Sequence, residues 1–276
     1  MSKFEGEKTY IYDVGDKDRL RLKILNDVYN PLSKQALLDI GIQNKKCVID
    51  IACGQGEMTC WMAKHISPDG IVVGIDASEE QLELAKQLAQ KQGLKNIRFI
   101  KQSVLDANFN DLIAQLPRNP DLMYSRWLLI HLENEKVKSV MHALYDLLEP
   151  GGMMAHEEVT LKESYLEQTA ESFKEYITLF TELAHKLNIS FDLGSNLMDL
   201  FSDVGYKQTR FKLSKPKFTP EQLYFFQLDL ESAIPVLERF NVAQKSDIDK
   251  LNFSITNDIS HGFDMTMTNY FVYGIK

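Results

Sequence analysis

The sequence has few cysteines, no long apolar run and no excess of basic charge. Its three cysteines, Cys47, Cys53 and Cys60, form no C-x-x-C pair, and an odd number cannot all pair within one chain. We therefore expect reduced thiols and a cytoplasmic location. No stretch approaches 18 uncharged apolar residues, so no membrane span is expected, and the N-terminus lacks the apolar segment of a signal peptide.

Positive charge and metal-ligand patterns are also scarce. The formal net charge is -8, from 31 basic and 39 acidic residues, and Lys and Arg form no run. A negative surface repels nucleic-acid phosphate and anionic lipid, which favours a small-molecule substrate over nucleic acid or membrane. The six histidines show no H-x-x-x-H spacing, so no metal site is expected. No pattern specifies an oligomeric state.

Strand-like and helical patterns alternate in the first half of the chain, whose 276 residues suit one large α/β domain. Short apolar runs predict strands at 47–51, 71–75, 97–100, 121–124 and 153–156. Helices are predicted from about Glu57, at 78–92 with Ser78 and Gln81 as a capping box, and at 133–148. Further strands are expected at 206–213 and 269–275. The alternation indicates a Rossmann-like, doubly wound, mostly parallel seven-stranded sheet with helices on both faces.

The remaining segments are predominantly helical. The expected helices are 17–40, broken at Pro31, then 163–187, 193–204, 219–240 and 246–259. We expect one domain made of an N-terminal helical arm (1–45), a cofactor-binding core (46–160), a helical lid insertion (161–205) and a C-terminal part of the sheet with added helices (206–276). The helix at 163–187 is additional to those that cover the sheet. It is therefore expected to close over the substrate pocket.

A small-residue turn follows the first strand, within residues 48–57. Gly54 and Gly56 lack a Cβ and allow the backbone to approach a ligand closely. A dinucleotide fingerprint needs G-x-G-x-x-G, but Thr59 stands at the third glycine counted from Gly54. Asp50 at the strand end repels a pyrophosphate and suits the ammonium group of a methionine moiety. Both features disfavour an NAD-dependent oxidoreductase and favour S-adenosylmethionine.

A second acidic residue, Asp76, ends the second strand, 20 residues after Gly56. A carboxylate at this place can accept hydrogen bonds from both hydroxyls of a ribose. The alternative is that Asp76 only caps the helix that starts after Ser78. The glycine turn upstream favours ribose binding.

Five segments in order, 48–57, 74–82, 96–106, 121–132 and 147–158, resemble those of class I S-adenosylmethionine-dependent methyltransferases. The most informative are Tyr124-Ser125-Arg126-Trp127 and Leu148-Glu149-Pro150-Gly151-Gly152. The resemblance implies a Rossmann-like fold, S-adenosyl-L-methionine as cofactor, and methyl transfer to a small organic acceptor. A non-catalytic protein that binds the cofactor in order to sense or recruit is the alternative.

The resemblance also implies which residues bind the cofactor. They are Tyr10, Tyr12, Asp50, Ala52, Cys53, Gly54, Gly56, Asp76, Ala77, Gln81, Ser103, Val104, Ser125 and Arg126. The two tyrosines resemble N-terminal aromatics that close over the cofactor. The chain departs from the family pattern in two places, because Ala52 replaces the first glycine and Ser103 replaces an acid near the adenine.

Methyl transfer from a sulfonium is an in-line displacement that depends mainly on alignment. A base helps only where the acceptor must lose a proton, and the candidates are His131 and Glu157. His131 can instead pack structurally, and Arg126 can either meet a ligand carboxylate or brace Glu157. One of Glu157 and Glu158 is expected to face outward, since neighbouring strand residues point to opposite faces. Trp127 is assigned to core packing.

Overall fold

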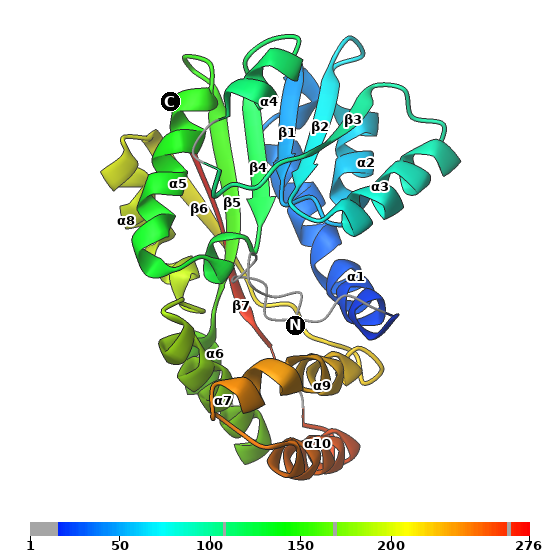
Figure 1. Cartoon of the computed structure of the whole chain (residues 1–276), viewed down its shortest axis with the longest axis vertical. Coiled ribbons are helices and arrows are strands. Elements are labelled where there is room, and N and C mark those ends of the chain that lie inside the picture. Colours follow the sequence, from blue (N-terminus) through cyan, green and yellow to red (C-terminus); the bar gives the residue numbers. More distant parts are fainter. Residues whose placement is uncertain (1–15, 107–108, 168–169, 264–265) are drawn as a thin grey trace.

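The computed structural model describes residues 16–106, 109–167, 170–263 and 266–276. Seven strands form one sheet in the order β3-β2-β1-β4-β5-β7-β6 (Figure 1). The strands are β1 (Cys47–Ile51), β2 (Ile71–Asp76), β3 (Ile97–Lys101), β4 (Leu122–Arg126), β5 (Met153–Thr160), β6 (Lys207–Ser214) and β7 (Thr268–Ile275). β1 to β5 pair in parallel, and β7 pairs antiparallel with β5 and β6. The predicted α/β fold with a mostly parallel seven-stranded sheet is confirmed.

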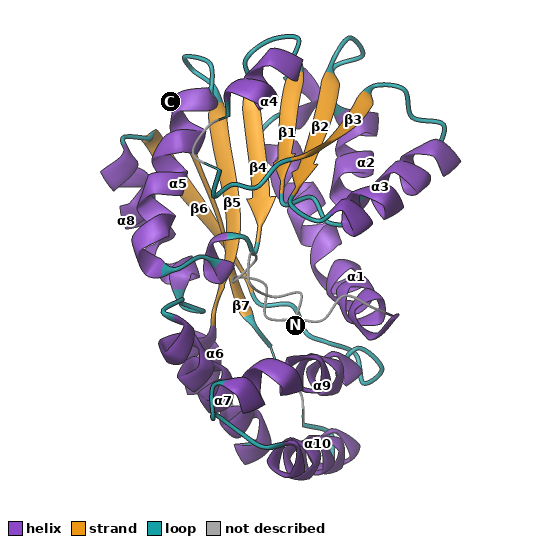
Figure 2. Cartoon of the chain, in the orientation of Figure 1, coloured by secondary structure: helices purple, strands orange, loops and turns teal. Residues whose placement is uncertain are grey.

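Helices cover both faces of this sheet (Figure 2). They are α1 (Asp16–Asp39), α2 (Glu57–His65), α3 (Glu79–Lys91), α4 (Asn110–Gln115), α5 (Asn134–Leu147), α6 (Leu161–Glu167), α7 (Glu171–Leu187), α8 (Leu193–Val204), α9 (Tyr224–Arg239) and α10 (Lys245–Ser260), with 3-10 turns η1 (Ile42–Asn44) and η2 (Leu129–His131). One face packs against α5 and α8, the other against α1 and α2. β1 is accordingly buried along its whole length, which explains why its sequence is apolar apart from Asp50.

A separate helical layer lies beyond the carboxyl ends of the parallel strands, where Figure 1 shows α7, α9 and α10 below the sheet. The three helices and α1 share one hydrophobic cluster, which includes Phe173 and Phe180 of α7 and Phe226 of α9. None of the helices in the described part of the chain is long and apolar enough to cross a bilayer. The apolar faces of α1, α7, α9 and α10 pack against one another in this hydrophobic cluster.

The limits of the predicted lid differ from the structure. α8 packs its apolar side chains, Leu197, Phe201 and Val204, into the core on the sheet, so it belongs to the sheet layer. The expected helix 163–187 is interrupted, because Ala170 has an extended backbone (ψ 126°) and caps α7. α9 and α10, expected as helices added to the sheet, instead complete the helical layer with α7.

Three local predictions are also corrected. α1 continues through Pro31, because buried residues on both sides of it, among them Tyr29 and Leu37, hold the helix against the core. α9 begins at Tyr224 rather than at 219. The capping box of α3 forms only by half: the Ser78 hydroxyl accepts from the Gln81 backbone N–H, whereas the Ser78 N–H donates to Asp76.

Candidate active site

The turn after β1 has a left-handed backbone at three residues, with φ of 56° at Ala52, 51° at Gly54 and 77° at Gly56. A Cβ on Gly56 would lie 2.7 Å from the Cβ of Ala85, so only glycine lets α2 begin this close to α3. A Cβ on Gly54 would meet no atom within 4 Å. The Gly54 backbone therefore faces open space, where a ligand can approach it.

This turn forms one wall of a pocket of about 120 Å³, which we call the cofactor pocket. Five of the predicted cofactor residues line it: Asp50, Ala52, Cys53, Gly54 and Arg126. Asp76 lies next to it, since one carboxylate oxygen accepts the Gly54 N–H at 2.9 Å and the other accepts the Ser78 N–H at 2.9 Å. Asp76 thus supports the turn and caps α3 at the same time.

The other predicted cofactor residues lie outside the lining of this pocket. Gly56 is buried at the start of α2, and the Gln81 side chain is buried on α3. Ala77, Ser103 and Val104 follow β2 and β3 at the same edge of the sheet. The Ser125 side chain is buried and hydrogen-bonded to His156, away from the pocket. Tyr10 and Tyr12 lie outside the described residues.

Several residues of the cofactor pocket were missed by the sequence analysis. They are Leu22, Leu25 and Asn26 of α1, Gln55, Glu57 and Met58 at the turn, and Tyr124 and Trp127 of the β4 end. Strand alternation carries a signal for Tyr124, which lies two residues before Arg126 and so on the same face. The residues of α1 have no local signal, because their place in the site depends on long-range packing.

Asp50 is the buried acid of the cofactor pocket. Its side chain accepts a 2.5 Å hydrogen bond from the Thr59 hydroxyl, and the residue is only 3% exposed. Burial raises the pKa of the Asp50 carboxyl to about 7, although Thr59 and the charge of Arg126 act in the opposite direction. A carboxyl of this kind takes its charged form most readily beside a bound cation.

A chain of hydrogen bonds connects Arg126, which lines the cofactor pocket, to the buried carboxylate of Glu157 on β5. Arg126 donates to the Ser33 hydroxyl at 3.1 Å, and Ser33 donates to the Glu157 carboxylate at 2.9 Å. Glu157 also accepts from Tyr124 at 2.8 Å and from Asn269 at 3.2 Å. Arg126 therefore braces Glu157 through Ser33 and at the same time faces the cofactor pocket.

Trp127 stands at the end of this chain. Its indole N–H donates to Asn269 at 3.1 Å, and its backbone N–H donates to the Glu157 carbonyl at 2.8 Å. Its φ of 53° is costly for a bulky side chain, and such outliers concentrate at functional sites. Trp127 packs against the hydrophobic cluster of α1, α7 and α9, as the sequence analysis assigned, and it also lines both pockets.

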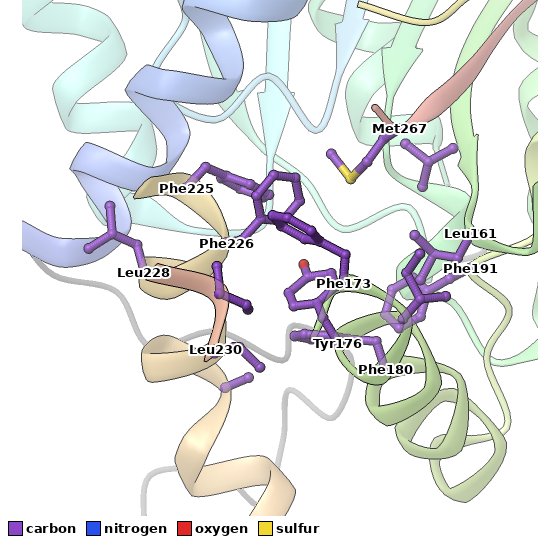
Figure 3. Close-up of a cluster of buried hydrophobic side chains, with 14 of the residues drawn as sticks. Leu161, Phe173, Tyr176, Phe180, Phe191, Phe225, Phe226, Leu228, Leu230 and Met267 are labelled. Atoms are coloured by element: carbon purple, nitrogen blue, oxygen red, sulfur yellow. The ribbon is translucent and has the colours of Figure 1, made fainter. Parts of the chain in front are cut away.

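The second pocket, which we call the acceptor pocket, lies on the other side of Trp127 and Leu25, the two residues that both pockets share. Its volume is about 70 Å³. Aromatic side chains dominate its walls: Trp127, Tyr176, Phe180, Phe191 and Phe225. Figure 3 shows the rings of α7 and α9 facing one another across this cluster, with Met267 above them. Tyr176 and Phe180 of α7 thus contribute to the wall of this pocket.

The two candidate bases occupy different places. His131 lines the acceptor pocket, where burial and the nearby charge of Arg21 lower its pKa to about 4. Glu157 lines neither pocket, and burial raises its pKa. Glu157 and Glu158 are both buried, at 1% and 0% exposure, so the expectation that one faces outward was wrong. The reason is that α1 covers one face of β5 while the turn after β4 covers the other.

Glu158 holds that turn. Its carboxylate accepts the backbone N–H groups of Leu128 at 3.1 Å and Leu129 at 2.7 Å, at the start of η2. Burial raises the pKa of the Glu158 carboxyl to about 8 despite these hydrogen bonds. The Glu158 carboxylate, together with the hydrogen bond from the Trp127 N–H to the Glu157 carbonyl, therefore ties the segment that carries Trp127 and His131 to β5.

The fold, with its glycine turn at the carboxyl edge and two adjoining pockets, defines a class I, Rossmann-like methyltransferase. Residues 42–211, more than half of the chain, match the family model of the methyltransferase domain. The chain belongs to this family and is a methyltransferase.

Individual relatives agree with this assignment. A demethylmenaquinone methyltransferase of Listeria welshimeri is 24% identical in an alignment 218 residues long that covers 70% of this chain and 84% of the relative. The structure of YcgJ from Bacillus subtilis superposes with a TM-score of 0.55 at 15% identity, covering 88% of this chain and 97% of that one. Phosphoethanolamine N-methyltransferase 2 of Haemonchus contortus, in complex with phosphomonomethylethanolamine and S-adenosylhomocysteine, superposes with a TM-score of 0.52 at 16% identity, covering 94% and 52%. At these identities the two structures support the fold.

Replacing Glu158 by Gln should flatten the dependence of stability on pH between 6.5 and 8. In this window the folded state holds a proton on Glu158 (pKa about 8) that the unfolded state has released, so stability falls as the pH rises. The loss amounts to about 2 kcal/mol across the window for one such group. Asp50, with a pKa of about 7, adds a slope at the lower end of this window in the wild type and the variant alike, whereas the buried histidines titrate below it because their pKa values are lowered from 6.5.

Urea unfolding at several pH values measures this effect. The variant keeps an oxygen that can accept the Leu128 and Leu129 N–H groups, so it should fold. The control is Glu149→Gln, which replaces a half-buried acid that pairs with Arg118. This variant should leave the slope unchanged. Parallel slopes in the wild type and in Glu158→Gln would contradict the prediction.

Proposed function

We propose that this methyltransferase transfers the methyl group of S-adenosyl-L-methionine to a small organic molecule held in the acceptor pocket. The observation that carries the proposal is that two pockets meet at the carboxyl edge of the sheet and share Trp127 and Leu25 as their common wall. Ligands of open α/β sheets bind at this edge. Two substrates that must react need adjoining sites of this kind.

The residues of the cofactor pocket fit S-adenosylmethionine. The buried Nε2 of Gln55 has no hydrogen-bond partner among the described residues, which is costly unless a ligand supplies one. The Asp50 carboxyl is suited to the ammonium group of the methionine moiety, and the open Gly54 backbone leaves room beside it. Asp76, at the end of β2, is placed for the ribose hydroxyls. The cofactor supplies an electrophilic methyl group bound to a sulfonium.

The acceptor is a small molecule in this proposal. The name of the Listeria relative gives demethylmenaquinone, a small molecule, as what that enzyme methylates. The net charge of -8 disfavours nucleic acid. Free thiols at Cys47, Cys53 and Cys60 support a cytoplasmic protein.

The two candidate bases receive different roles. His131 contacts the acceptor, and because it is neutral near pH 7 it can accept a hydrogen bond from an acceptor hydroxyl. Glu157 is a positioning residue, because its hydrogen bonds with Ser33, Tyr124 and Asn269 hold the wall between the pockets. In-line transfer depends on this alignment more than on a base.

Affinity for S-adenosylhomocysteine should fall as the pH drops below about 7. Free Asp50 has a pKa of about 7, and an ammonium beside it lowers that pKa, so below pH 7 binding must first remove a proton. The dissociation constant should rise by up to about tenfold per pH unit. Calorimetric titrations between pH 5.5 and 8.5 measure it.

Two variants give this experiment its controls. Asp50→Asn should bind more weakly at pH 8 and lose the slope. Thr59→Val removes the hydrogen bond that lowers the pKa of Asp50, so the midpoint should move to higher pH. Equal pH profiles for the wild type and Asp50→Asn would show that Asp50 does not face the amino group.

Replacing Asp76 by Ala should weaken binding of S-adenosylhomocysteine by about 1–3 kcal/mol, because the ribose hydroxyls lose a charged acceptor. Ser78→Ala is the matched control, since it removes the N-cap hydrogen bond to Gln81 without removing the carboxylate. The control should cost about 1 kcal/mol of stability and leave binding intact. If both variants bind alike, Asp76 serves only as a cap.

Replacing Phe180 by Ala should change which small molecules are methylated while affinity for S-adenosylhomocysteine changes less than about threefold, or ~0.7 kcal/mol. Phe180 is 2% exposed and lines the acceptor pocket but not the cofactor pocket. Phe173→Ala, in the same helix and the same cluster but outside the pocket, is the control. Both should lower the melting temperature, as large-to-small core changes do.

Methylated products from a panel of small molecules, together with cofactor titrations, distinguish the two variants. Phe173→Ala should keep the wild-type product pattern. The role of α7 as a wall that selects the acceptor would be refuted if both variants changed the pattern alike, or if Phe180→Ala lost cofactor affinity in parallel with turnover.

A further inference from the structure

β6 forms one edge of the sheet (Figure 1), since β7 is its only strand partner in the part of the chain that the structure describes. All residues from Arg210 to Leu213 are exposed, whereas the other edge strand, β3, is half-buried along much of its length. Alternate residues of an edge strand direct their backbone N–H and C=O groups away from the neighbouring strand. β6 therefore offers backbone groups with which a further extended segment can pair.

The edge formed by β6 is also basic. Residues 204–220 contain five basic residues and no acid, although the whole chain has a formal net charge of -8. Pairing β6 with the β6 of a second copy would place basic side chains beside basic side chains, and like charges opposite one another destabilise a strand pair. The charge of this edge therefore disfavours self-association and favours an acidic partner.

The basic and the apolar side chains of β6 lie on opposite faces of the sheet. The register with β7 places Arg210 and Lys212 on the face that α1 covers, where Lys212 forms an ion pair with Asp39. The same register places Phe211 and Leu213 on the face of α8, where they are 52% and 46% exposed. An added strand alternates between the two faces in the same way, so it can contact both sets of side chains at once.

A strand accounts for both faces, whereas a flat surface does not. A planar anionic membrane that contacts Arg210 and Lys212 would leave Phe211 and Leu213 turned away on the opposite face. Apolar side chains with this much exposure gain most from a partner that covers them. The two faces together therefore indicate an extended peptide in which acidic and apolar residues alternate.

We propose that β6 is a docking surface for an extended peptide segment of another protein, in which acidic and apolar residues alternate. The segment adds to the sheet as a further strand, and backbone hydrogen bonds supply its affinity. Acidic residues opposite Arg210 and Lys212, with apolar residues opposite Phe211 and Leu213, supply its specificity. Lys212 can exchange Asp39 for an acid of the partner, because this ion pair is exposed, at 42% and 43%, and exposed pairs contribute little.

A matched set of acetylated, amidated heptapeptides tests the proposal by fluorescence anisotropy with the whole chain. Glu-Val-Glu-Val-Glu-Val-Glu has the alternating pattern. Its analogue with Lys in place of every Glu should bind at least about tenfold more weakly, because like charges then oppose each other. The block peptide Glu-Glu-Glu-Glu-Val-Val-Val keeps the composition without the alternation, and Glu-Val-Glu-Pro-Glu-Val-Glu lacks a backbone donor. Both should also bind at least about tenfold more weakly.

Hydrogen exchange shows where the peptide binds. Amide hydrogens within residues 210–214 should exchange more slowly with the alternating peptide than without it, because strand pairing protects the N–H groups of an edge. The amides of β3, at the other edge of the sheet, should exchange at unchanged rates.

Single changes in β6 should alter the affinity for each peptide in a stated direction. Arg210→Glu should weaken binding of the alternating Glu/Val peptide about three- to tenfold and strengthen binding of the Lys/Val analogue. Phe211→Ser should weaken binding of the Glu/Val peptide about threefold or more, because less apolar area is then covered. Lys101→Glu, a matching charge reversal at an exposed residue of β3, is the control and should leave both affinities unchanged. All these side chains are exposed, so the variants should fold, which the melting temperature checks.

Equal binding of the alternating and the block peptide, or unchanged hydrogen exchange in β6, overturns the proposal. Binding to vesicles of phosphatidylcholine and phosphatidylserine without binding of any peptide overturns it in favour of a membrane surface. A dimer that Arg210→Glu disrupts overturns it in favour of a second copy of the chain. None of the described residues that line either pocket belongs to β6, so a failed titration with S-adenosylhomocysteine would leave this inference standing.

Discussion

The carboxylate of Glu157, buried within β5, joins this strand to α1, β4 and β7. It accepts hydrogen bonds from Tyr124 on β4, from Ser33 on α1 and from Asn269 on β7. A buried carboxylate is stable only when such donors surround it, and each donor would be costly to leave unpaired. The acid needs its donors and the donors need the acid. Glu157 therefore helps to position α1 and β7 relative to the parallel part of the sheet.

The same hydrogen-bond network fixes the position of Trp127, because Asn269 contacts both Glu157 and the Trp127 indole. Its left-handed backbone and its hydrogen bond to Asn269 hold the indole between the cofactor pocket and the acceptor pocket. The two pockets differ in their electrostatics. The cofactor pocket contains in Asp50 a carboxyl whose pKa burial raises to about 7, whereas the acceptor pocket contains the buried ion pair of Arg21 and Asp229.

Much of the sheet and of the turn beside the cofactor pocket was predictable, because both are encoded by short sequence patterns. The apolar run Cys47–Ile51 and the turn with Gly54 and Gly56 lie within ten residues of one another, and Asp76 follows at a characteristic spacing. Local signals failed where packing overrides them. Pro31 remains inside α1 since the helix is buried against the core, and Glu157 and Glu158 are both buried although strand alternation predicted that one of them faces outward.

The sequence by itself indicated the class of fold, the order of its strands and helices, and the acids and glycines that lie at the carboxyl edge of the sheet, since periodicity and turn chemistry act over a few residues. Only the tertiary structure decided the acceptor pocket. Arg21 and Asp229 are 208 residues apart, and the walls come from α1, η2, α7 and α9. No pattern of spacing encodes such a meeting, because it follows from how separate apolar helix faces pack together beyond the edge of the sheet.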